Sequence, residues 1–185
     1  MRENCDALIE TLEAMVRPFR GLLVGLDEAT LNRQPAAHKM SIAQIALHCF
    51  GHMRYFLTPP GGSPPFERAE WTCVPATYPL TLAQVNEQIE LGRSAMAAVL
   101  ASVDDAKLEG PWTLPGGKVV KLGYICARLL GHLLAHGAQI GYLRHMVQPA
   151  WSAGAAFGQL VTPLIELRYH TTADLSDTPT GRVAF

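Results

Sequence analysis

The sequence lacks the features that mark secreted proteins and nucleic-acid-binding proteins. It has no C-x-x-C pair and no dense cysteine pattern, which excludes a disulfide framework and favours reduced cytosolic thiols. Its four cysteines lie far apart, at Cys5, Cys49, Cys73 and Cys126. The 15 basic and 16 acidic residues nearly cancel, and the arginines form no cluster. Binding to nucleic-acid phosphates is therefore not expected.

A targeting segment and a membrane span are also missing. The N-terminus carries Arg2, Glu3 and Asp6 before any apolar run, and no small-residue cleavage site follows, so it does not resemble a signal peptide. The most apolar stretch, 122–146, is long enough to cross a bilayer, but it contains several polar residues, Arg128 among them. We therefore interpret it as a helix buried within a cytoplasmic protein that has no membrane partner.

Four segments with helical periodicity make up most of the chain. Apolar residues account for 49% and charged residues for 17% of the sequence, which is typical of a globular domain on the apolar side of average. The segments cover 4–25, 41–57, 81–103 and 122–146. Their lengths suit an up-and-down four-helix bundle, so the predicted fold is all-α.

Two of the segments begin with a capping box, in which a hydroxyl and an amide side chain satisfy each other's backbone groups. Ser41 and Gln44 form the pattern S-I-A-Q at the start of the second segment. Thr81 and Gln84 form T-L-A-Q at the start of the third. These pairs predict where the two helices begin.

The connectors define the expected domain organisation. The second connector, 58–79, contains six prolines and cannot be continuous helix, so it is predicted to cross one end of the bundle. A second turn-rich linker covers 110–117. We expect one bundle domain over 1–150 and a C-terminal extension over 151–185, with a short helix within the extension.

Histidines carry the clearest chemical signal. His132 and His136 lie one helical turn apart, where Cβ atoms are roughly 5–6 Å from each other and two imidazoles can bind one ion. Leu133 replaces the glutamate of the H-E-x-x-H motif, which excludes that protease class. His48 lies in the second segment, and facing helices of a bundle can converge on a metal. Ligation by His48, His132 and His136 would leave a coordination position open, as in catalytic sites.

Several residues are alternatives or additional candidates. His52 follows His48 by one turn, so the second segment has an H-x-x-x-H pattern of its own and His52 is a competing ligand. Gln139 can bond a ligand histidine, a substrate or the backbone. Arg128, one turn before His132, can receive an anionic substrate or pair with a carboxylate. The remaining histidines are expected to be solvated: His38, His145 and His170.

Two motifs resemble the DinB/YfiT-like superfamily. The first covers residues 31–57 and reads LNRQPAAHKMSIAQIALHCFGHMRYFL. In that family a metal-binding histidine follows the helix-starting serine by seven residues, which corresponds to Ser41 and His48. The second motif is a late H-x-x-x-H followed by Gly and Gln, which His132, His136 and Gln139 resemble. The resemblance extends over roughly residues 1–147.

The resemblance implies a four-helix bundle, often dimeric, with one divalent ion held by three histidines. Family members include bacillithiol-dependent thiol transferases, mycothiol-dependent maleylpyruvate isomerases and a domain of hercynine-oxidising enzymes. We therefore expect a thiol-dependent S-transferase or isomerase that acts on a small electrophile. A metal-dependent hydrolase of amide or ester bonds and a non-catalytic metal-binding bundle are the alternatives.

The expected cofactors and assembly follow from the same reasoning. Zn²⁺ is the default ion, and Ni²⁺, Fe²⁺ and Co²⁺ also suit imidazole ligands. A low-molecular-weight thiol would be the cosubstrate, and a homodimer is expected. Because a protonated imidazole cannot donate its lone pair, metal binding should fade as the pH falls through roughly 6.5.

Overall fold

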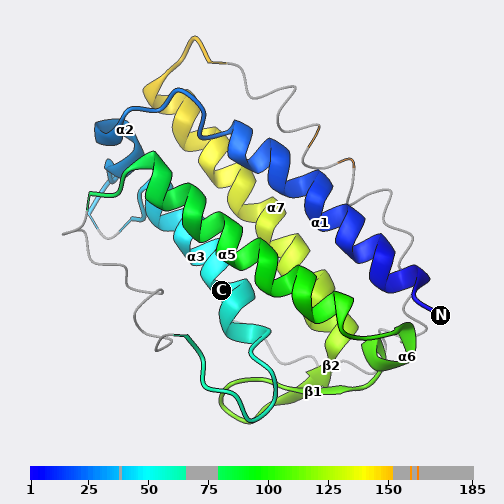
Figure 1. Cartoon of the computed structure of the whole chain (residues 1–185). Coiled ribbons are helices and arrows are strands. Elements are labelled where there is room, and N and C mark those ends of the chain that lie inside the picture. Colours follow the sequence, from blue (N-terminus) through cyan, green and yellow to red (C-terminus); the bar gives the residue numbers. More distant parts are fainter. Residues whose placement is uncertain (38, 66–78, 152–158, 160–161, 163–185) are drawn as a thin grey trace, which may run out of the picture.

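Four long helices lie side by side in the structure, a computed structural model that describes residues 1–37, 39–65, 79–151, 159 and 162 (Figure 1). They are α1 (Glu3–Gly21), α3 (Ile42–Phe56), α5 (Leu82–Ala101) and α7 (Leu122–Val147). Both α1 and α3 pack against α5 and α7, which closes a four-helix bundle. The predicted all-α fold is confirmed.

Some predictions fall where the structure gives no description. His38, Cys73, His170 and most of the C-terminal extension lie outside the described residues. Within the described residues, none of the helices combines the length and the apolar character needed to cross a bilayer.

The helix directions differ from a simple up-and-down order. The side chain of Asn32, which precedes α3, accepts from the amide of Leu80 (2.7 Å) and donates to its carbonyl (2.8 Å) just before α5. At the other end, Trp112 Nε1 donates to the carbonyl of Phe56 (2.9 Å), so α7 begins where α3 ends. The helices α3 and α5 therefore run parallel, in the order up, down, down, up (Figure 1). The 58–79 connector was predicted to cross one end of the bundle, whereas the described residues that flank it, Phe56 and Leu80, lie at opposite ends of the bundle.

Both predicted capping boxes are present. The Ser41 hydroxyl accepts from the amide of Gln44 (3.2 Å), and Gln44 Oε1 accepts from the amide of Ser41 (2.8 Å). Thr81 and Gln84 make the same reciprocal pair at the start of α5. Each box satisfies two backbone N–H groups that have no partner within the helix, so the local sequence determines where these helices begin.

The first helix ends four residues before its predicted end because a side chain from α7 caps it. Buried Arg144 donates to the carbonyl oxygens of Leu22 (2.8 Å) and Val24 (2.7 Å). A guanidinium satisfies terminal carbonyls and complements the negative end of the helix dipole. Gly25 then turns the chain with φ +77°, a conformation that favours glycine.

Short elements connect the long helices, and sequence periodicity did not predict them. They are α2 (Glu28–Asn32), α6 (Asp105–Leu108), β1 (Pro111–Thr113) and β2 (Val119–Lys121). The two strands pair antiparallel and replace part of the predicted turn-rich linker. Elements of three to five residues are too short to show a helical or alternating pattern of apolar residues.

The close contact of α3 with α5 depends on Gly92. A Cβ atom at this position would lie 2.6 Å from both Cβ and the carbonyl oxygen of Phe50. Because the helices would have to separate, we expect Gly92→Ala to lower the free energy of unfolding by about 1–3 kcal/mol in urea denaturation. Gly131→Ala is the matched control, since its Cβ meets nothing within 4 Å. Equal stability of the two variants would contradict this packing.

Candidate metal centre

Four histidines meet between α3 and α7. His48 and His52 lie one turn apart on α3, and His132 and His136 lie one turn apart on α7. Each is half-buried. Side chains four residues apart share a helix face, and α3 packs against α7, so the two pairs face each other. The rings of His48, His132 and His136 are thus neighbours, and His52 lies among them; we refer to all four as the histidine cluster.

The rings of the histidine cluster are in direct contact. The His132 ring centroid lies 4.2 Å from that of His136, 4.3 Å from that of His52 and 5.1 Å from that of His48. The His48 centroid lies 4.2 Å from His52 and 4.9 Å from His136. Because α3 and α7 are antiparallel, His48 lies opposite His136 and His52 lies opposite His132. The four rings therefore form one contiguous group between the two helices.

The donor atoms fit a divalent cation. One ring nitrogen from each of His48, His52 and His132 lies within 4.8 Å of the others. This donor group includes His52 and does not include the predicted ligand His136. Nε2 of His132 is buried and has no hydrogen-bond partner among the described residues. A buried nitrogen without a partner is costly, and a cation would satisfy it. An all-imidazole set suits Zn²⁺, Ni²⁺, Fe²⁺ or Co²⁺.

The environment lowers the pKa of three of these imidazoles, those of His52, His132 and His136. Burial, followed by the neighbouring His136 and His48, lowers the pKa of His132 to about 3. The pKa of His52 is lowered further, by burial and then by His132 and His48. Burial also lowers the pKa of His136. Neutral rings carry the lone pair that a metal ligand requires.

Gln139 orients one of the rings. Its Oε1 accepts a hydrogen bond from Nδ1 of His136 at 2.7 Å. An amide oxygen can only accept, so the proton sits on Nδ1 and the lone pair sits on Nε2. Ligating histidines are commonly held by a hydrogen bond of this kind from the second nitrogen. Gln139 was predicted to bond a ligand histidine, a substrate or the backbone, and in the structure it bonds a histidine of the cluster.

Arg128 is the charged residue beside the cluster. It is exposed on α7, one turn before His132, and its charge contributes to the lowered pKa of both His52 and His132. Among the described residues it forms no ion pair with a carboxylate. The predicted alternative of a structural pair with Asp or Glu is thus not found in this part of the chain, and the guanidinium faces solvent near the cluster.

The described cysteines are unsuited to act as nucleophiles. Cys5, Cys49 and Cys126 are free and buried. Burial raises the pKa of Cys5 to about 11 and that of Cys126 to about 12, and it also raises the pKa of Cys49. These thiols are protonated at neutral pH, as expected for small buried apolar residues.

His145 lies apart from the cluster. It is exposed near the end of α7, and its Nδ1 lies 3.1 Å from the carbonyl oxygen of Trp151. Its predicted position in solvent is confirmed.

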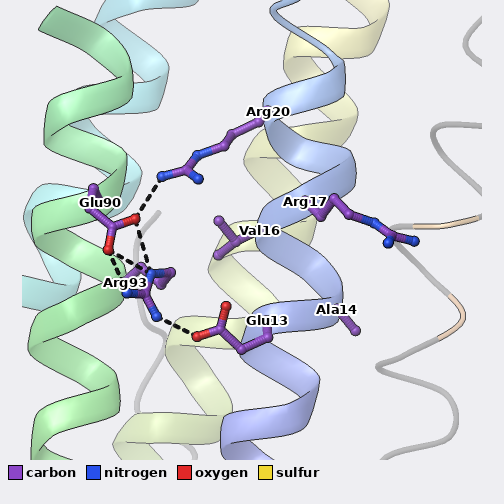
Figure 2. Close-up of a pocket in the computed structure, with 7 residues that line it drawn as sticks. All are labelled: Glu13, Ala14, Val16, Arg17, Arg20, Glu90 and Arg93. Carbon is purple, nitrogen blue, oxygen red and sulfur yellow. Dashed lines mark hydrogen bonds and ion pairs between the residues drawn. The ribbon is translucent and has the colours of Figure 1, made fainter. Parts of the chain in front are cut away.

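A charged groove between α1 and α5 is a separate concave feature (Figure 2). Glu90 lies between Arg20, at 2.8 Å, and Arg93, which also reaches Glu13. Arg93 and Arg20 lower the pKa of Glu90 to about 2. The only arginine of the groove that points away from these carboxylates is Arg17 (Figure 2). These ion pairs connect the two helices and neutralise one another, so we assign the groove a structural role.

Comparison with known proteins agrees with the fold and the cluster. The family model described as the DinB superfamily matches residues 11–140, which is more than half of the chain and includes all four cluster histidines. No curated protein matched the sequence. The histidines and the family together fit a metal-binding, enzyme-like protein. The chain belongs to the DinB superfamily.

Proposed function

We propose that this protein is a divalent-metal-dependent enzyme that acts on a small electrophile with the help of a low-molecular-weight thiol. Its reaction is either S-transfer to the electrophile or thiol-dependent isomerisation. The observation that carries the proposal is the group of four imidazoles from two helices whose rings are in direct contact. In this proposal His48, His132 and His136 hold the ion. Such an ion, when bound, lowers the pKa of a thiol or water that contacts it.

The rest of the site supports an external thiol. The three described cysteines are buried and protonated, so none of them offers a thiolate, and in this proposal the thiolate comes from a cosubstrate. Glutathione and bacillithiol carry carboxylates, and the exposed guanidinium of Arg128 would bind one beside the cluster. Gln139 would hold His136 with its Nε2 directed to the ion.

The test begins with metal analysis of protein purified without a nickel column and loaded with Zn²⁺. We expect about one equivalent per chain. The loaded protein is then assayed with monochlorobimane, a small electrophile, in the presence of glutathione, bacillithiol or mycothiol. The proposal expects saturable conjugation that requires both the ion and one of the thiols.

The same assay distinguishes the alternatives. Hydrolysis of 4-nitrophenyl acetate that needs the ion but no thiol would replace the proposal with a metal-dependent hydrolase. Binding of one ion with neither activity would favour a non-catalytic metal-binding bundle. Less than about a tenth of an equivalent of metal after loading would contradict the site itself.

Removing the acceptor on Gln139 should weaken metal binding. We expect Gln139→Leu to reduce the affinity for Zn²⁺ about tenfold, because His136 then loses the bond that places its proton on Nδ1. Competition with a chromophoric chelator measures this affinity. Gln139→Glu keeps an acceptor and is the matched control, so it should bind Zn²⁺ at least as tightly as the wild type. An equal loss in both variants would rule out a role for the hydrogen bond.

A homodimer is part of the proposal. The support is the apolar composition together with large exposed apolar side chains on α7, where Tyr142 is 67% and Met146 is 57% exposed. Sedimentation velocity at micromolar concentration should give the mass of two chains. A single monomeric species would contradict this prediction.

A further inference from the structure

His52 occupies a position that a three-histidine site does not require. Its ring stacks on that of His132, with centroids 4.3 Å apart and planes inclined by 26°, and it lies 4.2 Å from His48. The proposed ligands His48, His132 and His136 would complete a catalytic site without it.

The geometry places His52 within the ligand set and not at its edge. Donor nitrogens of His48, His52 and His132 all lie within 4.8 Å of one another, so one ion can contact all three. His136 is not part of that donor group, but its ring centroid lies 4.9 Å from that of His48 and 4.2 Å from that of His132. A tetrahedral ion takes four ligands of this kind, and the cluster supplies four imidazoles.

A purely structural explanation of His52 is packing. Its ring also contacts that of Phe56, with centroids 5.2 Å apart, so an aromatic side chain at position 52 would keep this packing. Packing alone does not require a nitrogen donor next to two other imidazoles. The two explanations differ in whether a phenyl ring can replace the imidazole, which makes them separable by experiment.

We propose that His52 is a fourth and exchangeable ligand, which fills the open coordination position of the resting site and leaves it when a thiol or other anion binds. This inference rests on the proposed three-histidine metal site. It assigns His52 a regulatory role at that site, since the resting ion would be shielded from small anions in solution.

Cobalt-loaded protein provides the test, because the visible absorption of Co²⁺ reports its coordination number and changes when azide binds. We compare the wild type with His52→Ala and with His52→Phe, which keeps a ring but has no donor. Both variants should retain Co²⁺, show an altered visible spectrum, and bind azide about tenfold more tightly than the wild type. His145→Ala is the matched control and should behave as the wild type.

Each outcome is decisive. If the spectrum and the azide affinity are unchanged in both variants, His52 has only a packing role. This result would overturn the inference and leave the metal site intact. If both variants lose Co²⁺ as completely as His48→Ala does, His52 is an essential ligand. This result would overturn the proposal that His52 leaves the ion when an anion binds. Absence of Co²⁺ binding by the folded wild type would instead refute the proposed function on which the inference rests.

Discussion

Replacement of His48, His132 or His136 by alanine is expected to abolish metal binding and any activity that depends on it. In the proposed site His132 and His136 would chelate from α7, and His48 would provide the ligand from α3. Loss of one of three ligands removes a substantial part of the binding free energy, and we expect at least about a hundredfold weaker Zn²⁺ binding. Elemental analysis after dialysis against a weak chelator measures the loss.

Two further variants make this prediction specific. His145→Ala removes an exposed histidine from the same helix and should retain full occupancy. His52→Ala should retain most of the metal, because three ligands remain. Helical circular dichroism of each variant tests whether the bundle is intact. Full metal retention in the triple variant of His48, His132 and His136 would refute both the site and the function built on it.

The metal-free protein is expected to lose stability as the pH falls below about 6.5. The pKa of His132 is about 3 in the folded protein, whereas the unfolded chain has the ordinary value of 6.5. Between these values the unfolded state binds a proton that the folded state does not. The free energy of unfolding therefore decreases as the pH decreases. The upper limit is about 1.4 kcal/mol per pH unit for each such histidine, and the actual slope is smaller because the rings are only half-buried.

Urea denaturation in EDTA at pH 7, 6 and 5 measures this slope. The lowered pKa of His52 acts in the same direction, and the groups that face the two rings are His48, His136 and Arg128. Glu90, with a pKa of about 2, titrates below this range. The double variant His52→Phe with His132→Phe should show a flatter slope. A wild type that is equally stable at pH 5 and pH 7 would contradict the prediction.

The same pKa values correct the prediction for metal release. From the sequence, binding was expected to fade through roughly pH 6.5, the ordinary value for an exposed imidazole. Burial and the neighbouring histidines hold the folded pKa values lower, so protons compete with the ion only at lower pH. We expect the folded protein to retain its metal to about pH 5.

Local sequence was enough to predict the four long helices and a candidate chelating pair of histidines. Periodicity predicted the four long helices, and the capping boxes at Ser41 and Thr81 gave the starts of α3 and α5 to within one residue, since these interactions involve neighbours in the chain. The i, i+4 spacing of His132 and His136 predicted a chelating pair for the same reason.

Interactions between distant segments were decided only by the tertiary structure. The parallel direction of α3 and α5 depends on where the 58–79 connector ends, and no local pattern encodes that. The end of α1 depends on Arg144, more than a hundred residues away in the chain. The sequence left His48 and His52 as competing ligands, whereas the structure places both beside His132, because a ring's neighbours across a bundle are set by helix packing and not by spacing along one helix.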